Sequence, residues 1–175
     1  MLTEHKSNVI NIIKWFFLAT GIGCIVGVLD AVFLKMLDGA ITFRNTIPMF
    51  YLGLPFVLYG VALLARKVAK RDKDYSTDAV INKINSYRPI SFISIFKGFT
   101  LSIVTMVTGG SAGKEAPCAD VGAGISSIIA RVFRMNLEDQ RKMMICGVSA
   151  GFAGVFGVPI SGALFGLEVL WVGHI

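Results

Sequence analysis

One short stretch holds the residues that are best placed to do chemistry: Gly-Gly-Ser-Ala-Gly-Lys-Glu-Ala-Pro, residues 109–117. Its glycines permit close approach to the backbone, and Pro117 is typical of the first turn of a helix. A helix that begins here turns free N–H groups and the positive end of its dipole towards a bound anion. The pattern predicts an anion site formed by the N–H groups around Gly113 to Ala116, with Ser111 orienting the loop.

Glu115 stands at the entrance of this predicted helix. In one interpretation its carboxylate only complements the helix dipole, with neighbouring Lys114 as its ion-pair partner. In the other it is a gate, which blocks the pathway when ionised and opens it when protonated or displaced by an anion. Acids in apolar segments are functional by default, so we expect the gate, with Lys114 beside the anion.

The segments that position this site are strongly apolar. The chain has 175 residues, of which 54% are hydrophobic and 16% charged, whereas soluble domains carry about 25% charged residues. Long apolar runs without charged residues indicate segments that lie in a lipid bilayer. Small residues four positions apart predict that the helices carrying them pack closely. The runs without Asp, Glu, Lys or Arg are 15–29, 49–65, 98–113 and 143–167, and the small-residue pairs are Gly23/Gly27, Gly147/Gly151 and Gly162/Gly166.

We therefore expect an all-α, polytopic transmembrane fold, with a cytoplasmic polar N-terminus at residues 1–8 and a membrane part at 9–175. After the first two spans the expected helices are short and interrupted by glycine. Broken helices of this type occur in membrane proteins where they line an ion pathway. The expected helices cover 9–37, 49–70, 78–86, 92–107, 117–133, 138–156 and the segment from Pro159, with an outer turn at 38–48.

The net charge of +6 comes from cations at the ends of apolar runs. The positive-inside rule then places the N-terminus and the 66–74 loop in the cytoplasm of a multi-pass protein of the cell membrane. A nucleic-acid partner is excluded, because no soluble face interleaves cations with aromatic residues. The cations concerned are Lys6, Lys14, Arg66, Lys67, Lys70, Arg71 and Lys73.

At residues 109–117 the chain resembles the G-[KR]-E-G-P motif of the CLC family of voltage-gated chloride channels and anion transporters. Residues 149–168 resemble the family's next helix pair, in the same order and at the same separation. The resemblance covers about residues 10–175 and implies the first of two inverted repeats. It also implies that Glu115 is the gating glutamate, that Pro117, Pro159 and Glu168 are structural, and that subunits form homodimers.

Some positions depart from the family pattern. Ala116 replaces the motif's second glycine, and Asp120 replaces a Gln, where we expect it to stabilise the helix dipole. The family's G-S-G-I-P signature falls near residues 74–78, so Tyr75 or Ser76 takes the place of its anion-binding Ser. A plain N-cap role for Ser76 or Thr77 is the alternative.

The identity of the anion, and whether its transport is coupled to protons, are inferred from the family resemblance. In the family's proton-coupled exchangers a second glutamate follows the position of Glu168, and here Val169 stands there, which favours passive conduction of chloride. The alternatives are a fluoride-exporting anion/proton exchanger and a non-conducting subunit. A second half, with a G-x-F-x-P helix entrance and a late Tyr, would complete the site.

Enzyme and metal chemistry find little support in the sequence. A phosphate-binding loop would need Gly at position 108 and Ser or Thr at 115, where Thr108 and Glu115 stand. His5 and His174 lie at opposite ends, and three dispersed cysteines favour neither a disulfide nor a metal. We expect no enzymatic activity, no cofactor and no metal.

Overall fold

The computed structural model describes residues 2–46, 49–71, 77–86, 88, 90, 92–108, 110 and 113–171. Over this part of the chain the regular structure is helical throughout, which confirms the expected all-α class. The elements are α1 (Leu2–Asn45), a 3-10 helix η1 (Phe50–Gly53), α2 (Leu54–Arg71), α3 (Thr77–Asn85), α4 (Phe92–Val107), α5 (Glu115–Val132), α6 (Leu137–Phe156) and α7 (Pro159–Trp171).

Helix α1 is longer than expected. We predicted a turn from residue 38, but the helix continues to Asn45, and its backbone is already helical at Leu2. Gly39 costs only about 1 kcal/mol in a helix interior. Leu37 is buried in a cluster with residues of α4, α5 and α6, and Ile41 packs against the same cluster. These tertiary contacts hold the helix together past the glycine.

Helix α1 is also the one described helix long and apolar enough to cross a membrane, over Val9–Asn45, and Leu54–Leu64 of α2 is a shorter apolar helix. Two other runs without charged residues do not form single continuous helices. The run at 98–113 leaves helical structure after Val107, and the run at 143–167 is broken at Gly157. Gly157 ends α6 in the left-handed conformation (φ 68°), and its N–H bonds the Ala153 carbonyl.

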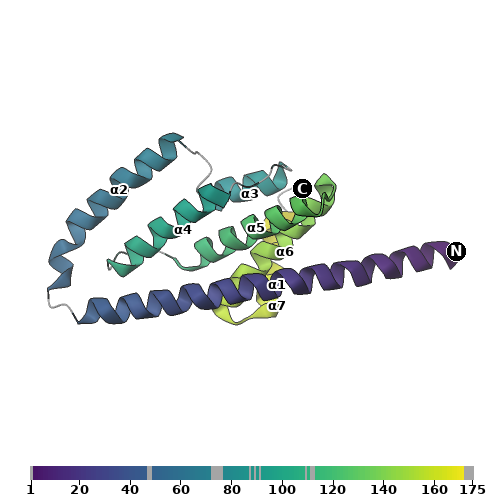
Figure 1. Ribbon diagram of the computed structural model, residues 1–175, viewed down its shortest axis with the longest axis horizontal. Coiled ribbons are helices and arrows are strands. Elements are labelled where there is room, and N and C mark those ends of the chain that lie inside the picture. Colours follow the sequence, from purple (N-terminus) through teal and green to yellow (C-terminus); the bar gives the residue numbers. More distant parts are fainter. Residues whose placement is uncertain are drawn as a thin grey trace.

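At the centre lie α5 and α6, which pack against each other as an antiparallel pair. A methyl group on Gly147 would meet the carbonyl of Gly122, and one on Gly151 would meet the carbonyl of Cys118. The two helices therefore touch backbone to backbone, as small residues permit. Figure 1 shows α1 running along this pair, and α2 at the left edge, away from it.

The predictions for the three pairs of small residues differ in their outcome. Gly147 and Gly151 both lie in the close α5–α6 contact, and Gly162 and Gly166 of α7 meet Ser149 of α6. Their predicted role in helix packing is confirmed. A methyl group on Gly23 or Gly27 would have no described atom within 4 Å, so that prediction was wrong for contacts within the described chain.

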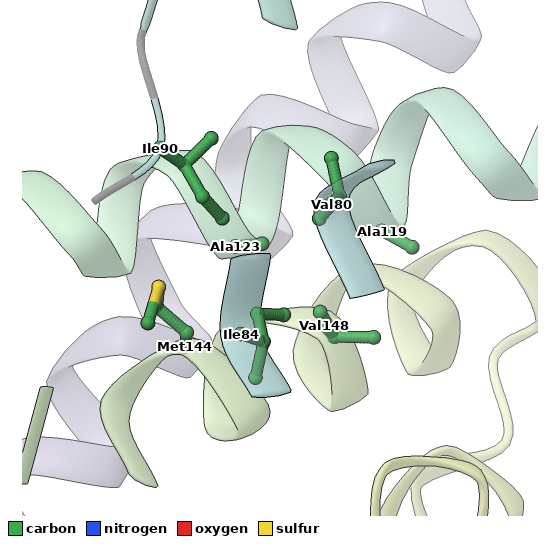
Figure 2. Close-up of a cluster of buried hydrophobic side chains, with 7 residues drawn as sticks. All are labelled: Val80, Ile84, Ile90, Ala119, Ala123, Met144 and Val148. Carbon is green, nitrogen blue, oxygen red and sulfur yellow. The ribbon is translucent and has the colours of Figure 1, made fainter. Parts of the chain in front are cut away.

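The short helix α3 is held against the central pair by apolar contacts. Val80 and Ile84 of α3, with Ile90, are buried against α5 and α6. Figure 2 shows these side chains converging on one cluster, whose other members are Ala119, Ala123, Met144 and Val148. The contact fixes α3 beside the first half of α5.

The beginning of α5 lies at the level of the middle of α1. Asp30, near the midpoint of the apolar stretch of α1, packs against Gly154 of α6 and lies beside the thiol of Cys118. Cys118 belongs to the first turn of α5. Further back along α1, Ile22 and Val26 share a cluster with Ala130. Helix α5 therefore starts at mid-depth of the α1 span.

The glycine contact between α5 and α6 can be tested by Gly147→Ala. We expect it to lower the free energy of unfolding by about 1–3 kcal/mol, because the new methyl group overpacks a backbone contact. The measurement is a denaturant titration followed by circular dichroism. Gly23→Ala is the matched control and should leave stability unchanged or raise it, by up to about 1 kcal/mol from helix propensity. Equal stability of Gly147→Ala and wild type would contradict the packing.

Candidate functional site

Helix α5 begins at Glu115, with Lys114 at the N-cap position (φ −85°, ψ −15°). The Lys114 side chain makes no capping hydrogen bond to this end of the helix, so the first N–H groups are left for other partners. The helix starts two residues before the position that we predicted, Pro117. The proline is buried in the first turn, where its missing N–H breaks no helical hydrogen bond.

The carboxylate of Glu115 turns back towards the residues that precede the helix. A methyl group on Gly113 would collide with its Oε2 atom. The carboxylate therefore lies over the backbone at Gly113, on the side of the open helix N-terminus, and the Glu115 side chain is only partly buried. This is the place that an anion attracted by the helix dipole would take.

Beside Glu115 lies a cavity of about 240 Å³ between four helices. Residues of α5 that are one and four positions apart form one wall, since they share a helix face. The opposite walls come from α3, α6 and α7. The lining residues are Val80, Ile81, Glu115, Ala116, Ala119, Asp120, Val148, Phe152 and Phe165.

Two aromatic residues that line this cavity were not predicted from the sequence as site residues. Phe152 of α6 stacks on Phe165 of α7, with ring centroids 4.2 Å apart and planes 8° apart. Phe152 also contacts Phe156 at 4.8 Å. The stack joins α7 to α6 and excludes water from one wall. Both residues lie within the 149–168 motif, which was the available signal.

Asp30 was missed as well. It lies within the predicted first helix, yet it is 2% exposed, and its Oδ2 has no hydrogen-bond partner among the described residues. A buried acid in an apolar helix is the signal that could have identified it. Because it contacts Cys118, it ties the first turn of α5 to α1.

The predicted site residues fall into three groups. Lys114, Glu115 and Ala116 come together at the start of α5, with Gly113 before them and Pro117 behind. Tyr75, Ser76 and Ser111 lie outside the described residues. Pro159 begins α7, as predicted, and Glu168 lies near the end of this helix; both are exposed and neither lines the cavity.

Asp120 lies in the second turn of α5 and lines the cavity. The effect of a helix dipole falls off within the first turn. The dipole role that we expected for Asp120 is therefore weak at its actual position, and its side chain belongs to the cavity wall.

Gly113→Ala tests the position of the Glu115 carboxylate. The methyl group should push this carboxylate off the helix N-terminus, at a cost of about 1 kcal/mol, and so raise the affinity for fluoride or chloride about fivefold. Isothermal titration calorimetry of the purified chain measures it. Gly60→Ala, where a methyl meets nothing within 4 Å, is the control. Unchanged affinity in Gly113→Ala would mean that the carboxylate does not compete with anions.

Comparison with known proteins shows the family to which the chain belongs. Residues 56–175 match the family described as voltage gated chloride channel. A chloride/fluoride channel protein of Pseudomonas syringae pv. tomato is 34% identical over 164 residues, which are 93% of this chain and 36% of the relative. The chloride channel protein CLC-c of Arabidopsis thaliana is 30% identical over 103 residues, 51% of this chain and 13% of the relative.

A solved structure, the crystal structure of a CLC-type fluoride/proton antiporter, has the same fold. It matches with a TM-score of 0.71 and 28% identity, over 90% of this chain and 40% of the other. The chain thus spans well under half the length of these relatives. The family match covers more than half of the chain, includes the motif at the start of α5 and agrees with the helix arrangement. The chain belongs to the voltage-gated chloride channel (CLC) family of membrane proteins.

Proposed function

We propose that this chain forms part of a CLC-type anion pathway, with chloride as the main ion and Glu115 as its gate. The observation that carries the proposal is the uncapped N-terminus of α5, with the Glu115 carboxylate turned back over Gly113 beside the cavity. The proposal involves no enzymatic step and no cofactor.

The physical argument starts from the cost of dehydrating an anion. At membrane depth there is little water to solvate charge, so an anion needs fixed donors. The N–H groups at residues 114–116 and the helix dipole supply them. Ionised Glu115 satisfies the same donors itself and excludes the anion. Once protonated, its carboxyl group binds them more weakly and can swing away, so anion passage depends on pH.

Fluoride is the second candidate ion. The relative from P. syringae is called a chloride/fluoride channel protein, and the solved structure is that of a fluoride/proton antiporter. Fluoride and chloride carry the same charge, and a mostly apolar cavity with few fixed donors offers little to distinguish them. Val169 replaces the internal glutamate of the family's exchangers, which supports passive conduction, with proton-coupled exchange as the alternative.

The charges favour a multi-pass protein of the cell membrane with a cytoplasmic N-terminus. Lys14 of α1 lies 3.9 Å from Asp139 at the start of α6, and Lys142 lies over the ring of Trp15 at 5.7 Å. Arg131 stands at the end of α5. Cations of three helices thus gather on one side, which we propose is cytoplasmic by the positive-inside rule. The start of α5 then faces the outer half of the membrane.

The pathway is completed by assembly, in our proposal, either as a homodimer or with a separate second half. The relatives are more than twice as long as the matched region, and the described cavity lies between α5 and the helices α3, α6 and α7. Large apolar side chains along α1 are exposed, among them Phe16, Phe17 and Val28. They fit a lipid bilayer or a partner helix.

Anion efflux from proteoliposomes containing the purified chain tests the proposal. We expect Glu115→Gln to change chloride or fluoride flux at neutral pH at least about tenfold, the rate effect of 1.36 kcal/mol at the barrier. Its pH dependence should also flatten. Glu138→Gln, an exposed acid at the start of α6, is the control and should match wild type.

Two results would count against this proposal in different ways. If Glu115→Gln conducts like wild type at every pH, Glu115 is not the gate. If the folded wild-type chain shows no flux, it does not transport alone, and the assembly with a second half becomes the form to test.

A further inference from the structure

Two lysines from different helices meet at one carboxylate. The ammonium nitrogen of Lys14, on α1, lies 3.9 Å from Oδ2 of Asp139, and that of Lys142, on α6, lies 3.7 Å from Oδ1. Lys142 also lies over the ring of Trp15, 5.7 Å from its centroid. The lysine side chains are 50% and 49% exposed, whereas Asp139 is 20% exposed. The group therefore presents two accessible ammonium groups for one carboxylate.

The packing of the helices brings these two lysines together. Trp15, the residue after Lys14, packs against the buried cluster that joins α1, α5 and α6, and Met143, the residue after Lys142, belongs to that cluster. Exposed ion pairs of Lys with Asp contribute little to stability. The lysines are thus held side by side by the apolar residues beneath them, and their charge remains available to a ligand.

Both lysines stand at the border of the apolar part of the chain. Lys14 directly precedes the charge-free run at 15–29, and Lys142 directly precedes the run at 143–167. Lysines at such borders extend their ammonium groups to the membrane surface, and Trp is enriched at the level of the lipid headgroups. The two ammonium groups therefore lie at the depth of the headgroup phosphates.

Apolar side chains and further cations surround the pair. Phe17 follows Lys14 by three residues, so it lies on the same face of α1, and it is exposed, as is Phe133 in the turn between α5 and α6. Arg131, at the end of α5, and Arg134, in this turn, are exposed as well. The surface combines positive charge with apolar contact area, as the headgroup and acyl chains of one lipid require.

The acids nearby do not cancel this charge. Glu138 and Asp139 both lie in the first turn of α6, where the positive end of the helix dipole offsets part of their charge. Asp139 also uses its backbone N–H in the cap of α6, which donates to Asn136 at 2.7 Å. The surface therefore favours a ligand with net negative charge.

We propose that Lys14 and Lys142, beside Trp15, bind the headgroup phosphate of an anionic phospholipid, whose acyl chains lie along the exposed apolar face of α1. Each ammonium group donates hydrogen bonds to phosphate oxygens. A zwitterionic phospholipid brings its own cation to the same place and gains less. The lipid joins α1 to the start of α6, and this role is independent of the anion pathway.

Fluorescence of Trp15 tests the proposal, because this residue lies in the site itself. The chain has two tryptophans, so Trp171→Phe leaves Trp15 as the single emitter. The full chain with this change is reconstituted in phosphatidylcholine vesicles that contain brominated phosphatidylglycerol, or brominated phosphatidylcholine, which quench the emission on contact. We expect phosphatidylglycerol to be preferred at least about tenfold, the effect of two cations at an anionic lipid. Salt of about 1 M should weaken the preference by screening.

Matched variants assign the preference to the two lysines. Lys14→Gln combined with Lys142→Gln should lower it to within about twofold, and each single change should lower it about threefold. Lys14→Arg combined with Lys142→Arg keeps the charge and should keep the preference. Lys35→Gln removes an exposed lysine about 30 Å further along α1 and should match the parent chain.

Three results would overturn the inference. The first is equal quenching of Trp15 by the two brominated lipids in the parent chain. The second is a full preference in the double Gln variant with an unchanged circular dichroism spectrum; should that variant not fold, the single variants decide in the same way. The third is no quenching by either lipid, which would mean that protein covers this surface.

Discussion

The close contact between α5 and α6 is the interaction on which the rest of the structure depends. Gly122, Gly147 and Gly151 let the two backbones meet, and this contact sets the antiparallel register of the pair. The pair in turn presents one surface to α1 and another to α3. Without glycine at these positions α5 would lie further out, and its first turn would not reach the middle of α1. The packing of small residues therefore fixes where the N-terminus of α5 lies relative to α1.

The functional proposal follows from this placement. A helix that starts at mid-depth leaves N–H groups that neither water nor lipid satisfies. The structure places an acid, Glu115, next to those groups and an apolar cavity beside them. The same helix carries Asp120, which also lines the cavity. In the proposed function, the anion donors and the gate thus belong to a single helix whose position is fixed by glycines.

The sequence was informative where local chemistry decides the structure. The start of α5 near Glu115, the start of α7 at Pro159 and the packing of Gly147 with Gly151 were all predicted. Long-range packing decided what was missed. Gly39 does not end α1, because Leu37 is buried in a tertiary cluster. Asp30, and the stack of Phe152 on Phe165, had signals in the sequence, an acid in an apolar helix and the 149–168 motif. Neither signal shows which helices meet, so the contacts themselves could not be predicted.

A crystal structure of Glu115→Gln grown in bromide, compared with wild type by anomalous scattering, tests the central claim most directly. Bromide takes the place of chloride or fluoride, and its anomalous signal locates the anion site without any assumption about transport. The account predicts an anomalous peak within hydrogen-bond reach of the first N–H groups of α5 in Glu115→Gln, and a much weaker one in wild type, where the carboxylate occupies the place. A variant that binds bromide elsewhere, with no peak at the start of α5, would contradict it.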